Sequence, residues 1–162
     1  MIFVELTDRE LRIASGVARI RYTAGVNAGA NKQKYGTVEN SLQLHVRGCL
    51  GEIAAAKGLN RYWHGGGTDY YNDTDLGIEQ VRMTSHVKIG RLIIRPDDIE
   101  KPSIDQPWIL VLQESKTKYI LSGWIIGREG VKPEYIDNPN DRSPAYFVPQ
   151  SALRSFPISY RN

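Results

Sequence analysis

The sequence predicts a mixed α/β domain, with one sheet of four to six strands and two N-terminal helices packed against it. Two stretches with apolar residues at helical spacing occupy the first third of the chain. Short runs rich in β-branched and aromatic residues follow, and an irregular segment lies near the C-terminus. A chain of 162 residues, 41% hydrophobic and 24% charged, is long enough to form a single core.

The first helix is expected to begin after Thr7 and to end within residues 25–29. Thr7 and Glu10 have the spacing of a capping box, in which each side chain accepts a hydrogen bond from the other residue's backbone N–H. Apolar residues then recur at helical spacing and form one stripe: Ile13, Val17, Ile20 and Ala24. Four arginines lie off this stripe and favour a solvated helix face over contact with a nucleic-acid backbone: Arg9, Arg12, Arg19 and Arg21.

A second helix is predicted from Asn40 or Ser41 to about Gly58. Its apolar stripe consists of Leu42, Val46, Leu50 and Ile53. Glu52 lies roughly 100° from that stripe on a helical wheel. Its neighbours one turn away are small, namely Gly48, Ala55 and Ala56. Small neighbours allow another part of the chain to approach this carboxylate, although Glu52 taken alone is more typical of an exposed helical residue.

Strand character is found in five short runs: residues 2–5, 78–85, 91–95, 108–113 and 119–127. The run at 108–113 is almost continuously apolar, which is typical of a strand buried on both faces. A short charged turn joins it to 119–127, so we expect these two runs to form a hairpin in the middle of the sheet.

The C-terminal part of the core is predicted to be irregular, because residues 128–145 are rich in Pro, Asn, Asp and Gly. The short run A-Y-F-V at 145–148 is followed directly by Pro149. Proline cannot donate to a strand ladder, so we expect this run to be an edge strand.

The composition excludes several classes of protein. Cys49 is the single cysteine, so no intramolecular disulfide can form, and its apolar surroundings place it in the core. The three histidines occur without a C-x-x-C or H-E-x-x-H motif, so we expect no zinc site. No apolar run approaches the roughly 20 residues needed to cross a bilayer, and the N-terminus lacks the features of a signal peptide. We therefore expect a cytoplasmic protein without membrane contact.

The stretch that carries the most chemical information is D-T-D-L-G-I-E-Q-V-R-M-T-S at residues 73–85. Side chains alternate along a strand, so Gln80 and Arg82 are expected on one face and Val81 and Met83 on the other. An acid at the start of a hairpin and a polar-x-basic triplet after it bring oxygen ligands close to a cation. That combination suits a hard metal ion beside a phosphate.

Two further stretches suggest contact with nucleic acid. Between Arg82 and Arg95 the chain contains four basic residues and no acid, which suits a polyanion, although a solvated hairpin surface is the simpler interpretation. The Gly-rich segment 60–72 contains four aromatic residues that could stack on bases or pack within the protein: Tyr62, Trp63, Tyr70 and Tyr71.

Several motifs occur in a fixed order over roughly residues 40–155. They are G-x-x-G-E-x-A-A-A-K-x-L, D-L-G-I-E-Q-V-R, L-I-I-R-P-D-D, W-I-L-V-L, G-W-I-I-G-R and P-A-Y-F-V-P-Q. In this order and spacing the chain resembles small phage-encoded proteins of the PD-(D/E)XK nuclease superfamily. The resemblance implies a restriction-endonuclease-like mixed sheet flanked by helices, in one nuclease-like domain over residues 1–162. Residues 1–38 would form an N-terminal helix and loop, and 39–155 the core.

The resemblance also implies an activity, a cofactor and a location. Members of this superfamily are metal-dependent nucleases, hydrolases that cut phosphodiester bonds with Mg²⁺ or Mn²⁺. The implied partner is nucleic acid, with DNA as the expected substrate, and a phage-encoded protein would act in the bacterial host cytoplasm. A homodimer is common among enzymes that cut both strands, but the sequence carries no signature of one. DNA and RNA, and single and double strands, stay open as substrates.

Carried over residue by residue, the helical acid falls on Glu52 and the hairpin acid on Asp75. The triplet falls on Gln80, Val81 and Arg82. The implied metal ligands are Glu52, Asp75, the Gln80 amide and the backbone carbonyl of Val81, with Arg82 against the scissile phosphate. The alternates are Asp73 in place of Asp75 and Glu79 in place of Gln80. The residues expected to bind nucleic acid are Lys88, Arg91 and Arg95.

Two departures from the superfamily pattern lead to a second hypothesis. Gln80 replaces an acid, and Arg82 replaces a lysine that could lose its proton, which an arginine in a protein does not. The chain is therefore alternatively interpreted as a catalytically weakened nuclease-fold module that binds nucleic acid or a host protein. A third hypothesis is an unrelated α/β protein in which residues 73–75 form an ordinary turn, and it predicts that Glu52 lies far from Asp75.

Overall fold

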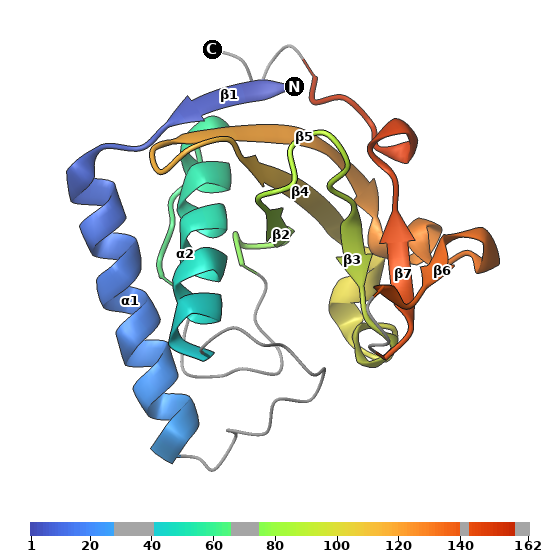
Figure 1. The fold of residues 1–162 in the computed structure, drawn as a ribbon, viewed down its shortest axis with the longest axis horizontal. Coiled ribbons are helices and arrows are strands. Elements are labelled where there is room, and N and C mark those ends of the chain that lie inside the picture. The colour runs from blue at the N-terminus through green and yellow to red at the C-terminus, as the bar shows by residue number, and fades with distance from the viewer. Residues whose placement is uncertain (28–40, 66–74, 140–142, 158–162) are drawn as a thin grey trace.

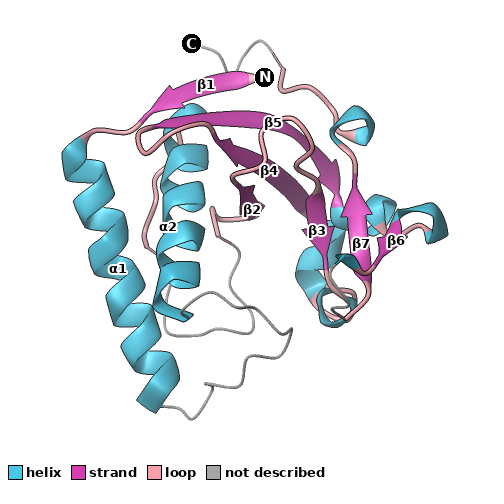
Figure 2. Cartoon of the chain, in the orientation of Figure 1, coloured by secondary structure: helices cyan, strands magenta, loops and turns pink. Residues whose placement is uncertain are grey.

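The computed structural model describes residues 1–27, 41–65, 75–139 and 143–157. These residues form a mixed α/β fold with two α-helices and two sheets, one of four strands and one of three (Figures 1 and 2). The predicted fold class is therefore confirmed at this level, whereas the prediction of one sheet is wrong. None of the helices in the described ranges combines the length and apolarity needed to span a bilayer.

The larger sheet has the strand order β1-β5-β4-β2. Its strands are β1 (Ile2–Glu5), β5 (Lys118–Ile126), β4 (Pro107–Gln113) and β2 (Gln80–Thr84). Strands β4 and β5 form the predicted hairpin in the middle of the sheet, and β2 pairs with β4 in parallel. Strand β2 lies at the edge of this sheet, and α2 packs against it.

The smaller sheet has the order β3-β7-β6, with β3 at Leu92–Ile94, β7 at Ala145–Val148 and β6 at Ile136–Asp137. The prediction that 145–148 is an edge strand is wrong, because β7 pairs with a neighbour on each side. Pro149 follows the last residue of β7 and so removes no hydrogen bond from the ladder. Strand β6 also interrupts the segment that was expected to be irregular.

Helix α2 (Ser41–Gly58) packs directly on the four-stranded sheet, whereas α1 (Asp8–Asn27) packs mainly on α2. The capping box at the start of α1 is confirmed, since Thr7 N donates to Glu10 Oε2 (2.7 Å) and Glu10 N to Thr7 Oγ1 (3.3 Å). The prediction that both helices lie on the sheet is wrong for α1. Figure 1 shows α2 between α1 and the strands.

The apolar stripe predicted for α1 is also wrong. Ile13 and Ile20 are 45% and 67% exposed, while Ala14 and Ala18 are completely buried. Alanines on the contact face let two helices approach closely, since no long side chain separates them. The face of α1 that meets α2 is therefore the one that carries Arg21, one turn beyond Ala18.

The four-stranded sheet has an apolar core on each face. Val81, Ile109 and Val111 belong to the core beneath the helices. Trp108 and Leu110 belong to the core shared with the three-stranded sheet. The prediction that 108–113 is buried on both faces is confirmed, because alternate residues of β4 enter the two cores.

Candidate functional site

Glu52 lies on α2 and is only 4% exposed, so its interpretation as an exposed helical glutamate is wrong. The half of α2 that carries Glu52 is enclosed by α1 on one side and by the sheet on the other. Arg21 of α1 binds the carboxylate with two hydrogen bonds, from Nη1 to Oε1 (2.6 Å) and from Nη2 to Oε2 (2.7 Å). Trp63 Nε1 donates to Oε2 at 3.0 Å. A buried acid is thus fully paired with a guanidinium and an indole.

Arg21 connects three parts of the chain. Besides Glu52, it donates from Nε and Nη2 to the Gly65 carbonyl, at 2.9 and 2.6 Å. Burial alone would lower the pKa of Arg21, but the hydrogen bonds and charge of Glu52 hold that pKa above its ordinary value. The interpretation of Arg21 as part of a solvated helix face is therefore wrong. Trp63 is a packing aromatic on Glu52, Tyr62 is 86% exposed, and Tyr70 and Tyr71 lie outside the described residues.

Asp75 occupies the turn before β2. Its Oδ2 accepts a hydrogen bond from Val81 N (2.7 Å), and its backbone N–H donates to the Glu79 carbonyl (3.0 Å). Gly77 closes this turn with a φ of 83°, a conformation that suits glycine. No described residue donates a hydrogen bond to Asp75 Oδ1. The local sequence thus fixes the direction of this carboxylate and leaves one of its oxygens available.

The pKa of Asp75 is raised to about 6. Burial is the largest cause and the negative charge of Glu52 the next, while Arg82, the Val81 N–H and Arg21 act in the opposite direction. The structure therefore brings Glu52 within electrostatic range of Asp75, although the two are far apart in the sequence. Asp73, the alternate for Asp75, lies outside the described residues.

The triplet on β2 has the predicted alternation. Val81 and Met83 pack in the core beneath α2, and Gln80 and Arg82 face the other side of the sheet. Gln80 is 8% exposed, and its amide forms no hydrogen bond with the described residues. Glu79, the alternate for Gln80, is two residues before Val81 and so is expected on the same side of the strand as Val81. It forms an ion pair with Arg61 (3.7 Å). Gln80 thus differs from Glu79 in lacking a partner among the described residues, but it lies on the face of β2 away from α2 and Glu52.

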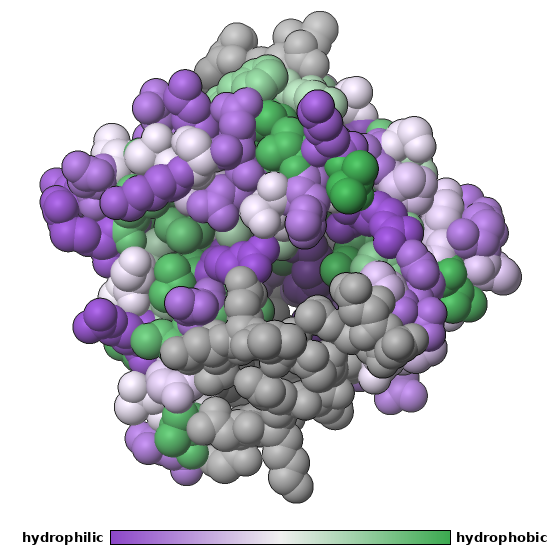
Figure 3. Space-filling model, viewed as in Figure 1, coloured by the Kyte–Doolittle hydropathy of each residue, from purple (hydrophilic) through white to green (hydrophobic). Residues whose placement is uncertain are grey.

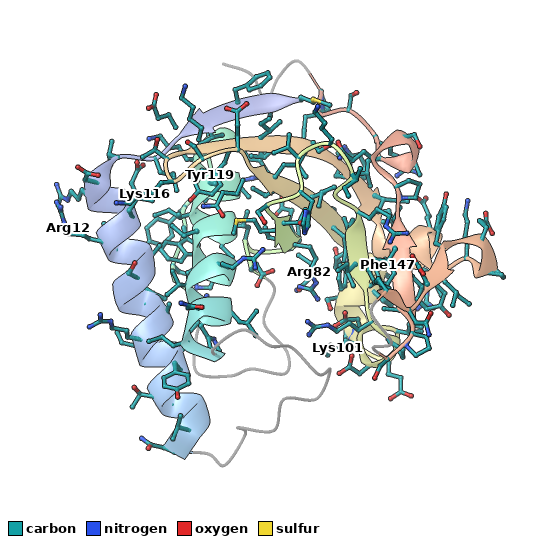
Figure 4. All side chains as sticks on the ribbon, in the orientation of Figure 1. Arg12, Arg82, Lys101, Lys116, Tyr119 and Phe147 are labelled. Atoms are coloured by element: carbon teal, nitrogen blue, oxygen red, sulfur yellow. The ribbon has the colours of Figure 1, made fainter. Side chains whose placement is uncertain are left out.

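Arg82 has three contacts that set its direction. Its Nη1 donates to the Val81 carbonyl (3.2 Å), its Nη2 pairs with Asp98 Oδ2 (3.2 Å), and its guanidinium lies 4.5 Å from the centre of the Trp108 ring. Figure 4 shows Arg82 in the middle of the molecule, between α2 and β3. Hydrophilic side chains gather around a hollow in the middle of the same face (Figure 3). The Val81 carbonyl, a predicted metal ligand, thus already accepts a hydrogen bond.

The predicted nucleic-acid-binding residues do not act as one group in the structure. Lys88 is exposed in the connection between β2 and β3. Arg91 forms an ion pair with Asp137 (2.7 Å) and lies over the Phe147 ring, both in the three-stranded sheet. Arg95 is exposed and its backbone N–H donates to Asp98 Oδ2 (3.0 Å). Of these three, Arg95 lies nearest in the chain to the contacts of Arg82.

A metal ion at this site would bind through oxygen atoms, which are the ligands that Mg²⁺ prefers. Asp75 Oδ1 and the Gln80 amide carry no hydrogen bond from the described residues, whereas both oxygens of Glu52 are bound to Arg21. Within the described ranges, no three His, Cys, Asp or Glu side chains gather as a metal cluster. Asp75 therefore fits Mg²⁺ in its chemistry, whereas Arg21 competes with the ion for Glu52, and Gln80 lies on the face of β2 away from α2.

A cavity of about 440 Å³ lies elsewhere in the molecule, along α1. Its lining residues come from one side of α1 and the turn between β4 and β5: Asp8, Leu11, Arg12, Ser15, Gly16, Arg19 and Lys116. None of the candidate site residues lines it. The candidate site is thus a polar cluster at the edge of the sheet and not this cavity.

Sequence reasoning missed two residues of the cluster, Arg21 and Asp98. Asp98 belongs to the L-I-I-R-P-D-D motif, so a signal for it was present in the sequence. The corresponding signal for Arg21 is its position three residues after Ala18 on the alanine face of α1.

The chain matches no protein-family model, no curated protein and no solved structure. A function is therefore inferred from the arrangement of Glu52, Asp75, Gln80 and Arg82.

Proposed function

We propose that the protein is a metal-dependent nuclease with a restriction-endonuclease-like fold, which hydrolyses phosphodiester bonds in nucleic acid and takes DNA as its expected substrate. One observation carries the proposal. Asp75, held in the turn before an edge strand, has a pKa raised to about 6 by burial and by the charge of Glu52. A carboxylate pair kept together at such an electrostatic cost is more typical of a functional site than of a structural one.

The arrangement of the elements supports the same proposal. A helix supplies Glu52, a turn supplies Asp75, and the next strand supplies Gln80 and Arg82 on one face. Strand β2 is parallel to β4 and antiparallel pairs complete the sheet, so the sheet is mixed. This order of helix, turn and strand is the one that the superfamily resemblance implies.

Asp75, Glu52 and the Gln80 amide are the residues that would hold Mg²⁺ or Mn²⁺. The ion would supply positive charge at the scissile phosphate and activate a water molecule. Asp75 must be ionised for this role, which its pKa of about 6 allows near neutral pH. Arg82 stabilises negative charge on the phosphate but does not accept a proton, since a guanidinium stays charged in proteins.

A second candidate function is nucleic-acid binding without cleavage. Arg21 occupies both oxygens of Glu52, and the charges of Arg21 and Arg82 offset those of the two carboxylates. A site with this balance attracts a divalent cation less than an all-acid site does. The observation that favours binding alone is therefore the two-bond contact between Arg21 and Glu52.

A cleavage assay separates the two functions. Supercoiled plasmid and labelled single strands are incubated with Mg²⁺, with Mn²⁺ and with EDTA, beside the double variant Glu52→Ala/Asp75→Ala. The matched control is Glu100→Ala/Glu134→Ala, which removes two negative charges from exposed positions. Circular dichroism checks folding, because Glu52→Ala leaves Arg21 without its partner carboxylate.

The proposed nuclease requires metal-dependent cleavage that the double variant loses and the control retains. Cleavage that survives the double variant contradicts the site. Absence of cleavage with either metal, together with retained DNA binding, identifies the binding module.

A further inference from the structure

Asp98 is a buried carboxylate between two cations. It ends the short 3₁₀ helix Pro96–Asp98 and is 3% exposed. Its Oδ1 binds Lys101 Nζ at 2.9 Å, and its Oδ2 binds Arg82 Nη2 at 3.2 Å. The backbone N–H of Arg95 also donates to Oδ2 (3.0 Å). A single side chain thus places a lysine and an arginine side by side.

The charge of this group is not balanced within itself. Arg82 and Lys101 each carry one positive charge and share the one negative charge of Asp98. Two cations held this close repel each other, and one carboxylate offsets only part of that repulsion. The three side chains together therefore carry one net positive charge, which is shared between Asp75, when it is ionised, and a phosphodiester group that binds here.

Both cations also keep donors for a ligand. The Arg82 and Lys101 side chains are 28% and 36% exposed, whereas that of Asp98 is 4% exposed. Arg82 and Lys101 each donate one N–H to Asp98, and Arg82 donates another to the Val81 carbonyl. Both side chains therefore keep further N–H donors. The exposed ends are thus cationic, and the acid that holds them is covered.

Trp108 fixes the plane of the arginine. The Arg82 guanidinium lies 4.5 Å from the ring centre of Trp108, which is itself 1% exposed and held by a hydrogen bond from Nε1 to the Ser103 carbonyl (2.9 Å). A guanidinium stacked on a buried ring loses little further freedom when it binds an anion. The arginine is therefore preorganised.

The group lies near one carboxylate of the candidate site, that of Asp75. The backbone N–H of Val81, the residue before Arg82, donates to Asp75 Oδ2 (2.7 Å), and the charge of Arg82 lowers the pKa of Asp75. Lys101 binds the other carboxylate oxygen of Asp98, and Figure 4 shows Lys101 below Arg82 in the same part of the molecule.

We propose that Arg82 and Lys101 form one phosphate-binding pair for the backbone of a nucleic acid, with Asp98 as the positioning residue that holds both. The proposal rests on the nucleic-acid function proposed above and adds Lys101 and Asp98 to it. The pair binds a phosphodiester beside Asp75, the carboxylate within electrostatic range of Arg82. It also supplies a lysine to a site whose β2 triplet contains none.

Binding of a labelled oligonucleotide in EDTA tests the pair without any contribution from metal or cleavage. The test variant is Lys101→Met, which keeps the aliphatic stem and removes the charge. The matched control is Lys116→Met, an exposed lysine in the turn between β4 and β5, on the other side of the molecule (Figure 4). We expect Lys101→Met to weaken binding about tenfold at low salt, as for the loss of a charged hydrogen bond.

Three features of the data support the proposal together. The control Lys116→Met keeps wild-type affinity, Lys101→Arg restores most of the affinity, and the loss caused by Lys101→Met shrinks as salt rises, because phosphate contacts are salt-dependent. Wild-type affinity in Lys101→Met overturns the proposal. An equal loss in Lys116→Met also overturns it, since binding would then follow net charge alone.

The same measurements separate this pair from the proposed nuclease. If the wild-type protein binds through Lys101 but does not cut with Mg²⁺ or Mn²⁺, the result supports the phosphate-binding pair and contradicts the proposed nuclease activity. If the wild-type protein cuts, and Lys101→Met binds and cuts equally well, the result supports the nuclease activity and contradicts the phosphate-binding pair. A wild-type protein that does not bind the oligonucleotide overturns the pair directly.

Discussion

Asp75 and Asp98 interact with the same guanidinium, that of Arg82, yet their pKa values move in opposite directions. Burial raises the pKa of both. Asp98 then gains Arg82, the Arg95 N–H and Lys101, and its pKa falls below the ordinary value. Asp75 instead faces the charge of Glu52, and its pKa stays raised at about 6. The donors around Asp98 together outweigh its burial, whereas those around Asp75 do not outweigh its burial and the charge of Glu52.

The contrast separates an acid whose charge is fully paired from one that is only partly paired. Asp98 is satisfied by several donors, so its negative charge stabilises the fold around the end of β3. Asp75 has one backbone donor and an oxygen without a hydrogen bond from the described residues. Asp75, whose ionised form lowers the stability of the free protein, is therefore the acid with an oxygen left for a ligand.

The largest expected effect is on Asp98. Asp98→Asn keeps the shape but leaves Arg82 and Lys101 without their carboxylate, so we expect the free energy of unfolding near pH 7 to fall by about 2–3 kcal/mol. Because the folded pKa of Asp98 is lowered, the loss should disappear as the medium is acidified and the wild-type carboxylate also becomes protonated. Urea denaturation across pH measures both. A loss below about 0.5 kcal/mol would contradict a structural role.

The opposite sign is expected for Asp75. The folded state holds the Asp75 proton up to about pH 6, against an ordinary value of 3.8, so stability falls as pH rises between these two values. Asp75→Asn removes this cost and should stabilise the protein by about 1–2 kcal/mol above pH 7. The gain should vanish near pH 4. Urea denaturation of both proteins over this range checks the sign, and an equal gain at every pH would contradict it.

Metal binding should follow the same titration. Ionised Asp75 is needed to bind Mn²⁺, so with a pKa of about 6 we expect the affinity to rise about tenfold from pH 5 to pH 7.5. Titration calorimetry with Mn²⁺ measures this rise, and Asp75→Asn should remove it. Affinity that is independent of pH in the wild type would show that Asp75 is not a ligand.

The smallest expected effect concerns Arg21, which binds the carboxylate of Glu52. Arg21→Lys replaces a two-bond contact with a single point charge, which leaves one oxygen of Glu52 for a metal ion. We expect Mn²⁺ affinity to rise about threefold, at a cost of about 1 kcal/mol in stability. Arg19→Lys, on the exposed side of the same helix, is the control. A fall in Mn²⁺ affinity would mean that Arg21 helps the site to bind metal.

Much of the secondary structure was predictable because its signals are local. The capping box of Thr7 and Glu10 and the hairpin of β4 and β5 depend on residues close together in the chain. The arrangement of strands was less predictable. Nothing within 145–148 indicates that β3 and β6 pair with it from either side, since its partners lie in other segments.

Parts of the candidate site were also predictable from local signals, and other parts were not. The alternation that places Val81 toward α2 and Arg82 on the other face was readable from the sequence, as was the turn of Asp75 and Gly77. The partner of Glu52 was not. Arg21 is separated from Glu52 by 31 positions, and the apolar stripe predicted for α1 assigned Arg21 to solvent.

The sequence by itself determined where the helices and most strands form, which face of β2 carries Gln80 and Arg82, and which acids are candidates for a metal ion. Periodicity, caps and turns act over a few residues, so they need no tertiary contact. Only the tertiary structure decided that Arg21 binds Glu52 and that Arg82 reaches Asp98, whereas Lys101 lies only three residues from Asp98 in the chain. The first pairing follows from the packing of the alanine face of α1 on α2, and the second from the face of β2 that carries Arg82, opposite α2.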